Sequence, residues 1–119
     1  MKEKKKLLVV EDEKNLCLLY REELAKEGYK VVAVSDADSA LAAIKKQKFD
    51  LIITDIRMPI KNGIDLITQI MALRKDIPII INTAYQSYKH DFMTWAADAY
   101  IVKSASLDEL KSKIKELVG

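Results

Sequence analysis

The amino-acid sequence predicts an α/β protein in which repeated strand–helix units build a parallel sheet. Two patterns lead to this prediction. Short runs of mostly β-branched apolar residues recur along the 119 residues, and they lack the alternating polar positions of a strand with one face in water. The segments between these runs carry apolar residues at three- and four-residue steps, as amphipathic helices do. Strands that alternate with such helices are typical of parallel sheets covered on both faces.

Each predicted strand is an apolar run short enough to be buried on both faces, and each is followed by a predicted helix. The strands are Leu7–Val10, Val31–Val34, Leu51–Ile53, Ile77–Ile81 and Ala99–Val102. In the first helix Leu16, Leu19, Tyr20 and Leu24 form one apolar face, and Gly28 ends the segment. The other helices are Ala37–Lys46 with Asp36 as N-cap, a segment with Ile64, Ile67, Ile70 and Met71 on one face, a less regular segment over Tyr85–Ala96, and Leu107–Val118.

The composition of the chain excludes several classes of function and site. With 20 Lys and Arg against 18 Asp and Glu, the formal net charge is +2, so we expect no direct nucleic-acid binding. The single cysteine excludes a disulfide framework and a zinc site built from several cysteines. No apolar run approaches the roughly 20 residues of a membrane helix, so we expect a cytoplasmic protein without membrane insertion. The length fits one domain over residues 1–119.

Polar residues end four of the predicted strands. In chain order they are Glu11–Asp12, Thr54–Asp55, Asn82–Thr83 and Lys103. Ligands of open parallel sheets bind at the carboxyl ends of the strands, where the strand order reverses. If the first and third strands are neighbours, three carboxylates, a hydroxyl and an ammonium group meet at one edge of the sheet.

Three carboxylates in one place repel one another strongly. At an effective dielectric constant of about 20, each pair at about 4 Å costs about 4 kcal/mol. Lys103 offsets part of this repulsion, and a hard divalent cation with oxygen ligands would offset the rest. Mg²⁺ suits the site because it needs few protein ligands and keeps several waters. A carboxylate cluster with a metal ion, a hydroxyl and a lysine is suited to phosphoryl transfer.

Each of these residues also has an ordinary structural interpretation. Asp12 could cap the first helix, Glu11 could be a solvated loop residue, and Thr83 could be a turn hydroxyl. Lys103 could lie at a strand end with its ammonium group in water. Capping does not explain Asp55, because no helical pattern starts directly after it. The occurrence of the whole set at four strand ends favours the functional interpretation.

Several stretches resemble the receiver domain of two-component response regulators, and the resemblance covers nearly the whole chain. They are Val9–Glu13, Asp50–Pro59, Asn62–Gly63, Asn82–Tyr85 and Tyr100–Lys103. The resemblance implies a flavodoxin-like (βα)5 fold, with a five-stranded parallel sheet of order 2-1-3-4-5 and helices on both faces. It also implies a phosphorylation-activated switch of a bacterial phosphorelay. Such a switch is not an enzyme in the usual sense, although it promotes its own phosphorylation and dephosphorylation.

The resemblance assigns the acidic residues. By position, Asp55 resembles the phosphoacceptor, and Glu11 and Asp12 resemble the acidic pair that holds Mg²⁺. The implied metal ligands are Glu11, Asp12, Asp55 and the backbone carbonyl of Arg57. Glu11 departs from the family's more usual aspartate, because its side chain is one methylene longer.

The resemblance also assigns the groups that respond to the phosphoryl group. Thr83 and Lys103 match the family's phosphoryl-sensing hydroxyl and lysine. Tyr100 occupies the place of an aromatic residue that moves inward on activation. Ser104 follows the lysine, where the family often has proline.

The implied partners follow from the same family. The phosphoryl donor is a histidine kinase or a histidine phosphotransfer protein, and Asn15 and Leu18 on the first helix are candidate contacts with it. The readout face comprises the fourth helix, fifth strand and fifth helix. This face would contact a downstream output protein or domain, and a homodimer through it is left open.

Three other readings are weaker. An aspartyl phosphatase needs a second aspartate two residues after the nucleophile, and Arg57 stands there. A flavodoxin-like mononucleotide binder needs a Ser-, Thr- or Gly-rich phosphate loop, whereas Glu11–Glu13 would repel phosphate. A phosphorylation-independent interaction module on the same fold is disfavoured by the complete residue set, which has no role in such a module.

Overall fold

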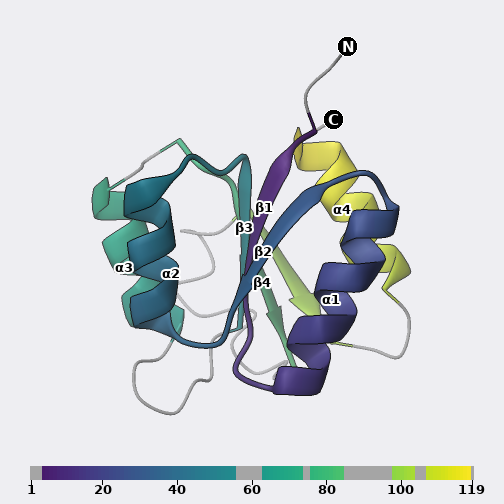
Figure 1. Cartoon of the computed structure of the whole chain (residues 1–119), viewed down its shortest axis with the longest axis horizontal. Coiled ribbons are helices and arrows are strands. Elements are labelled where there is room, and N and C mark those ends of the chain that lie inside the picture. The colour runs from purple at the N-terminus through teal and green to yellow at the C-terminus, as the bar shows by residue number, and fades with distance from the viewer. Residues whose placement is uncertain (1–3, 56–62, 74–75, 85–97, 104–106, 119) are drawn as a thin grey trace.

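The computed structural model confirms the predicted sheet (Figure 1). Five parallel strands lie in the order β2-β1-β3-β4-β5. The strands are β1 (Lys6–Val10), β2 (Lys30–Val34), β3 (Leu51–Thr54), β4 (Ile79–Thr83) and β5 (Ala99–Val102). The structure describes residues 4–55, 63–73, 76–84, 98–103 and 107–118.

The helices within the described residues cover both faces of the sheet, as Figure 1 shows. Helices α2 (Ala37–Lys46) and α3 (Gly63–Leu73) lie on one face, and α1 (Lys14–Lys26) and α4 (Asp108–Val118) lie on the other. The Asp36 side chain caps α2 as predicted, because it accepts a 2.7 Å hydrogen bond from the backbone N–H of Ser39. The helix predicted over residues 85–96 lies outside the described residues. No helix in the described parts of the chain is long and apolar enough to cross a membrane.

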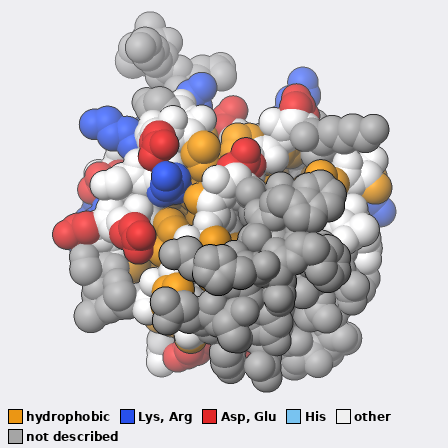
Figure 2. Space-filling view, turned by 180° about the vertical axis from the view of Figure 1, so that it is seen from behind, with side chains coloured by type: hydrophobic (Ala, Val, Ile, Leu, Met, Phe, Trp, Pro, Cys, Tyr) orange, Lys and Arg blue, Asp and Glu red, His pale blue; other side chains and the backbone are white. Residues whose placement is uncertain are grey.

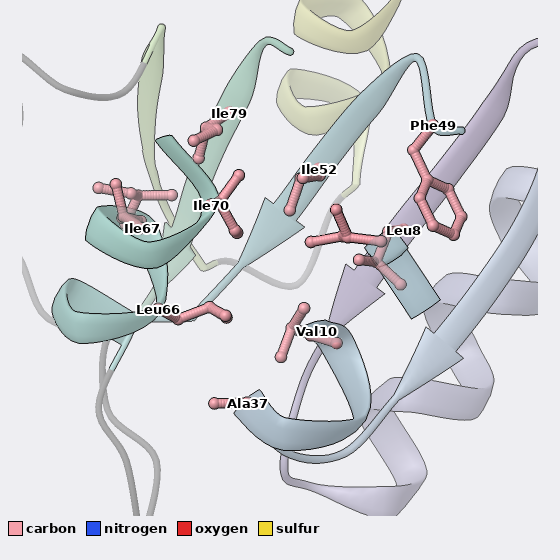
Figure 3. Packing of buried hydrophobic residues seen from close by; sticks show 12 residues of the cluster. Leu8, Val10, Ala37, Phe49, Ile52, Leu66, Ile67, Ile70 and Ile79 are labelled. Atoms are coloured by element: carbon pink, nitrogen blue, oxygen red, sulfur yellow. The ribbon is translucent and has the colours of Figure 1, made fainter. Parts of the chain in front are cut away.

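The core has two layers, because successive side chains of a strand point to opposite faces. Leu8, Val10 and Ile52 of the strands pack against α2 and α3, and α3 contributes Leu66 and Ile70 to this layer (Figure 3). The alternate residues of the same strands pack against α1 and α4; they are Leu7, Val9, Leu51 and Ile53. This burial on both faces explains the unbroken apolar runs in the sequence.

Two details of the prediction were wrong. Leu19 was expected on the buried face of α1, but it is 41% exposed. Tyr20 and Leu24, four residues apart, face the sheet, and Leu19 is turned about 100° away from Tyr20 around the helix axis. The fourth strand begins at Ile79 rather than Ile77, since Pro78 between them has no N–H to donate to a neighbouring strand.

Candidate functional site

Three of the predicted residues stand directly after strands of the sheet. Glu11 follows β1, Asp55 follows β3 and Lys103 follows β5. Their backbone N–H groups still donate to carbonyls of neighbouring strands, at 3.0, 3.2 and 2.7 Å, and these carbonyls belong to Val34, Val10 and Thr83. The sheet therefore fixes the backbone from which each functional side chain extends.

Strand alternation also sets the direction of these side chains. The residues two positions earlier, Val9, Ile53 and Ile101, all pack on the face that α1 and α4 cover. Side chains two apart in a strand point to the same face, so the three functional side chains lean toward that face as well. They leave the carboxyl-terminal edge of the sheet, which is the lower edge in Figure 1.

A buried ion cluster results from this placement. The Lys103 Nζ lies 2.5 Å from Oε1 of Glu11 and 2.7 Å from Oδ2 of Asp55. Glu11 is 2% exposed and Asp55 is 6% exposed. The second carboxylate oxygen of Glu11 accepts a 3.1 Å hydrogen bond from the backbone N–H of Glu13. Glu11 is therefore not a solvated loop residue, and the Lys103 ammonium group does not simply extend into water.

Burial and pairing set the charge states in the cluster. Burial raises the pKa of Glu11, and the neighbouring charge of Asp55 acts in the same direction. The hydrogen bonds from Lys103 and from the Glu13 backbone act against this effect without cancelling it. For Lys103, burial alone would lower the pKa, but the hydrogen bonds to Asp55 and Glu11 outweigh it and raise the pKa. The lysine therefore stays charged at neutral pH.

The three predicted acidic residues also meet the requirements of a metal site. Glu11, Asp12 and Asp55 each offer a carboxylate oxygen, and these oxygens lie within 4.8 Å of one another. Only oxygen donors are offered, as a hard cation such as Mg²⁺ prefers. Asp12 is exposed, so the group opens to solvent. Glu13, not Asp12, occupies the N-cap position of α1, so the capping interpretation of Asp12 is wrong.

The predicted sensing residues Thr83 and Tyr100, on β4 and β5, lie on the opposite face of the sheet. Thr83 is fully buried, and Tyr100 is partly buried against the cluster beneath α2 and α3. In the β4–β5 register Ile81 is opposite Tyr100, so Thr83, two residues after Ile81, points to the same face as Tyr100. Arg57 and Ser104, which the sequence analysis also named, lie outside the described residues.

Sequence reasoning gave no role to two polar residues behind the cluster. Tyr20 is 3% exposed and Asn82 is 4% exposed, and both lie on the face of the sheet that α1 and α4 cover. The available signals were a tyrosine within an apolar helical stripe and an asparagine that ends a run of isoleucines. Neither signal alone shows that the two residues are buried on the same face, because they are far apart in the chain.

Comparison with known proteins identifies the family. Residues 7–115 match the family model described as response regulator receiver domain. The chain belongs to the response regulator receiver family. The match includes all five strands except the first residue of β1, and the four described helices except the last turn of α4.

Solved structures and curated proteins agree with this assignment. The response regulator protein TrrA of Thermotoga maritima, in complex with Mg(2+)-BeF, is 43% identical with a TM-score of 0.91, over 95% of this chain and 98% of the TrrA chain. A complex of histidine kinase ThkA with TrrA gives 43% identity and a TM-score of 0.90, over 97% and 99% of the two chains. The transcriptional regulatory protein RprY of Bacteroides fragilis is 36% identical over 99% of this chain and 51% of RprY. The chain thus spans about half the length of the first curated relatives it matches.

The two candidate partner contacts on α1 of the receiver lie at its surface. Asn15 is exposed and Leu18 is 46% exposed. Both border a shallow hollow of about 320 Å³ between α1 and β2, lined by Lys14, Asn15, Cys17, Leu18, Arg21 and Ala33. The hollow combines apolar surface with two basic side chains.

Proposed function

We propose that this receiver is a phosphorylation-driven switch in which Asp55 accepts a phosphoryl group from a phosphohistidine. One observation carries the proposal. The buried Asp55 carboxylate shares the Lys103 ammonium group with Glu11, and it offers an oxygen within 4.8 Å of carboxylate oxygens of Glu11 and Asp12. Such a cluster is costly for the fold alone, and its charges suit a carboxylate that attacks phosphorus.

The proposed step is an in-line substitution at phosphorus. A carboxylate oxygen of Asp55 forms the new O–P bond while the P–N bond to the donor imidazole breaks. The imidazole nitrogen leaves with the electron pair of that bond, and the product is an acyl phosphate. Lys103, already 2.7 Å from Asp55 Oδ2, is close enough to pair with a phosphoryl oxygen. Most of the catalytic effect then comes from positioning and charge neutralisation.

Mg²⁺ is the metal ion that fits the carboxylate group. When bound, it supplies positive charge between the protein carboxylates and the phosphoryl oxygens. Glu11, Asp12 and Asp55 would hold it, and the backbone carbonyl of Arg57 stays a predicted further ligand. The TrrA complex with Mg(2+)-BeF supports this assignment. We propose that the receiver promotes its own phosphorylation and dephosphorylation in this way and is a switch rather than an enzyme with a separate substrate.

We propose that Thr83 and Tyr100 carry the response. Thr83 would donate its hydroxyl proton to a phosphoryl oxygen, and Tyr100, on the same face, would move into the space that Thr83 leaves. The surface of β5, α4 (Asp108–Val118) and the segment predicted as a helix over residues 85–96 would then contact an output protein, an output domain or a second copy. RprY, about twice as long as this chain, is named as a transcriptional regulatory protein, which supports an output domain.

A histidine kinase is the proposed donor, supported by the complex of ThkA with TrrA. Asn15 and Leu18 border the hollow beside α1, and we propose that the kinase contacts them there. A histidine phosphotransfer protein is the alternative donor. The cytoplasmic location and the extent of one domain over residues 1–119 stay predictions.

The proposal is tested by incubating the protein with acetyl phosphate and Mg²⁺ and measuring its intact mass. We expect one added phosphoryl group on the native protein and none on Asp55→Asn. Asp76→Asn is the matched control, because Asp76 is an exposed aspartate away from the cluster, and it should be labelled like the native protein. No adduct on the native protein would instead support a phosphorylation-independent interaction module.

A further inference from the structure

Thr54, the residue directly before the proposed phosphoacceptor, has no role in the proposed chemistry. It is the last residue of β3 and is fully buried. Its hydroxyl group donates a 2.9 Å hydrogen bond to the backbone carbonyl of Asp55. Such a bond offsets the cost of burying a hydroxyl group. The contact joins a side chain of the core directly to the backbone of the acceptor.

The Thr54 side chain belongs to the layer beneath α2 and α3. In the parallel register Thr54 is opposite Val10 on β1 and Ile81 on β4. Both neighbours pack in that layer, so the Thr54 side chain points into it as well. The Asp55 side chain extends toward the other face, where its Oδ2 lies 2.7 Å from the Lys103 Nζ. Thr54 therefore contacts the acceptor backbone from the face opposite to the ion cluster.

Two hydrogen bonds restrain the acceptor backbone on both sides of its Cα atom. The N–H of Asp55 donates to the Val10 carbonyl at 3.2 Å, and the carbonyl of Asp55 accepts the Thr54 hydroxyl proton. Each peptide group is planar, so these bonds restrain the two planes that meet at the Asp55 Cα atom. The two planes set the direction of the Cα–Cβ bond and hence the reach of the carboxylate. Because β3 ends at Thr54, the second bond acts just beyond the strand.

Packing alone does not explain a hydroxyl group at this place. Valine has nearly the same shape as threonine, is equally at home in strands and needs no hydrogen-bond partner. Val10 fills the neighbouring register position in the same layer, which shows that the layer accepts valine. The residue that carries the hydroxyl group is the one that precedes Asp55. The hydroxyl group is therefore best explained by its contact with the acceptor backbone.

We propose that Thr54 is a positioning residue of the acceptor site, whose hydroxyl group holds the Asp55 carbonyl and so aims the Asp55 carboxylate for in-line attack on phosphorus. This inference rests on the proposed function and deepens it. In-line attack needs aligned reacting atoms, and a small misplacement of a reacting group can slow a reaction by orders of magnitude. Loss of the hydroxyl group should therefore slow phosphoryl transfer even where the shape of the side chain is kept.

Two substitutions separate the hydroxyl group from the shape of the side chain. Thr54→Val keeps the branched shape without the hydroxyl group, whereas Thr54→Ser keeps the hydroxyl group without the methyl group. Labelling by acetyl phosphate is followed by intact mass, for each protein at a Mg²⁺ concentration that no longer limits the rate. We expect Thr54→Val to be labelled about tenfold more slowly than the native protein, and Thr54→Ser at nearly the native rate. A native rate for Thr54→Val, or an equal loss for Thr54→Ser, would overturn the inference.

Thr54→Ala, which lacks both groups, completes the set and separates positioning from stability. The labelling rate should depend on the hydroxyl group, so Thr54→Ala should be as slow as Thr54→Val. The free energy of unfolding should depend mainly on the buried methyl group, so urea unfolding should show a loss for Thr54→Ser and Thr54→Ala. If the labelling rates instead follow the methyl group, Thr54 has only a structural role and the inference fails. An unlabelled native protein, in contrast, would remove the proposed function and this inference with it.

Discussion

Two ion clusters of this receiver both pair lysine with carboxylates, but in different surroundings. In one, Lys103 bridges the buried carboxylates of Glu11 and Asp55 at 2.5 and 2.7 Å. In the other, Lys111 of α4 reaches Glu23 of α1 at 3.3 Å, and Glu23 also pairs with Lys26 at 3.1 Å. On the side of the molecule where α1 and α4 lie, acidic and basic side chains alternate at the surface (Figure 2).

The glutamates of the two clusters titrate in opposite directions. Burial raises the pKa of Glu11 although Lys103 bonds to it. Hydrogen bonds from Lys26 and Lys111 lower the pKa of Glu23, whose side chain is partly exposed. The comparison shows that a lysine partner alone does not decide the charge state of a glutamate. The surface cluster joins two helices at little cost, whereas the buried cluster is costly and therefore points to function.

Removing the central lysine should separate the two clusters most clearly. Lys103→Met leaves two buried carboxylates without their cation, and we expect the free energy of unfolding to fall by about 3 kcal/mol in Mg²⁺-free buffer at neutral pH. Urea unfolding measures this change. A free energy of unfolding equal to that of the native protein would mean that the two buried carboxylates do not depend on the lysine for stability.

Mg²⁺ should stabilise the folded protein through the buried cluster and not through the surface cluster. At a Mg²⁺ concentration of about ten times its Kd, we expect the free energy of unfolding to rise by about 1.4 kcal/mol. Asp12→Asn should reduce this gain, because it removes one of three oxygen ligands, while Glu23→Gln should retain it. A gain that survives Asp12→Asn in full would place the metal ion elsewhere.

The opposite pKa shifts predict opposite pH dependences in Mg²⁺-free buffer. Between the ordinary value of 4.5 and its raised value, Glu11 binds more protons in the folded than in the unfolded chain, so its contribution to stability falls as the pH rises through this window. Glu23 contributes stability above 4.5, which is lost as the pH falls through its lowered pKa.

Urea unfolding of the native protein, Glu11→Gln and Glu23→Gln over acidic to neutral pH measures these slopes. Glu11→Gln should remove a decrease with rising pH, and Glu23→Gln should remove an increase. If the free energy of unfolding of all three proteins depended on pH in the same way, Glu11 and Glu23 would not have the opposite pKa shifts described above.

The smallest effect is expected in the surface cluster. Lys111→Met removes ion pairs to two partly exposed carboxylates, those of Glu23 and Glu27. We expect a small decrease in Tm at low salt that disappears at about 1 M NaCl, where the screening length is about 3 Å. A loss of stability as large as that of Lys103→Met, or one that persists in high salt, would show that solvent exposure does not determine how much each cluster contributes to stability.

The strand order and most of the site could be predicted because strand ends are visible in the sequence. Apolar runs show where each strand stops, and the residue that follows points to a known face. The burial of Glu11 could not be predicted, since it depends on Lys103, which is 92 residues away. The same reason hid the shared placement of Tyr20 and Asn82, because periodicity shows which side chains are buried but not which distant polar residues lie on one face.

The central claim is that Asp55 is the phosphoacceptor, and one measurement tests it directly. The protein is labelled with acetyl phosphate and Mg²⁺, reduced with borohydride and cleaved into peptides for mass spectrometry. Hydride reduction of an acyl phosphate releases phosphate and converts the aspartate to homoserine. We expect homoserine at position 55 and at no other aspartate position. Homoserine at Asp12 or another aspartate, with Asp55 unchanged, would contradict it.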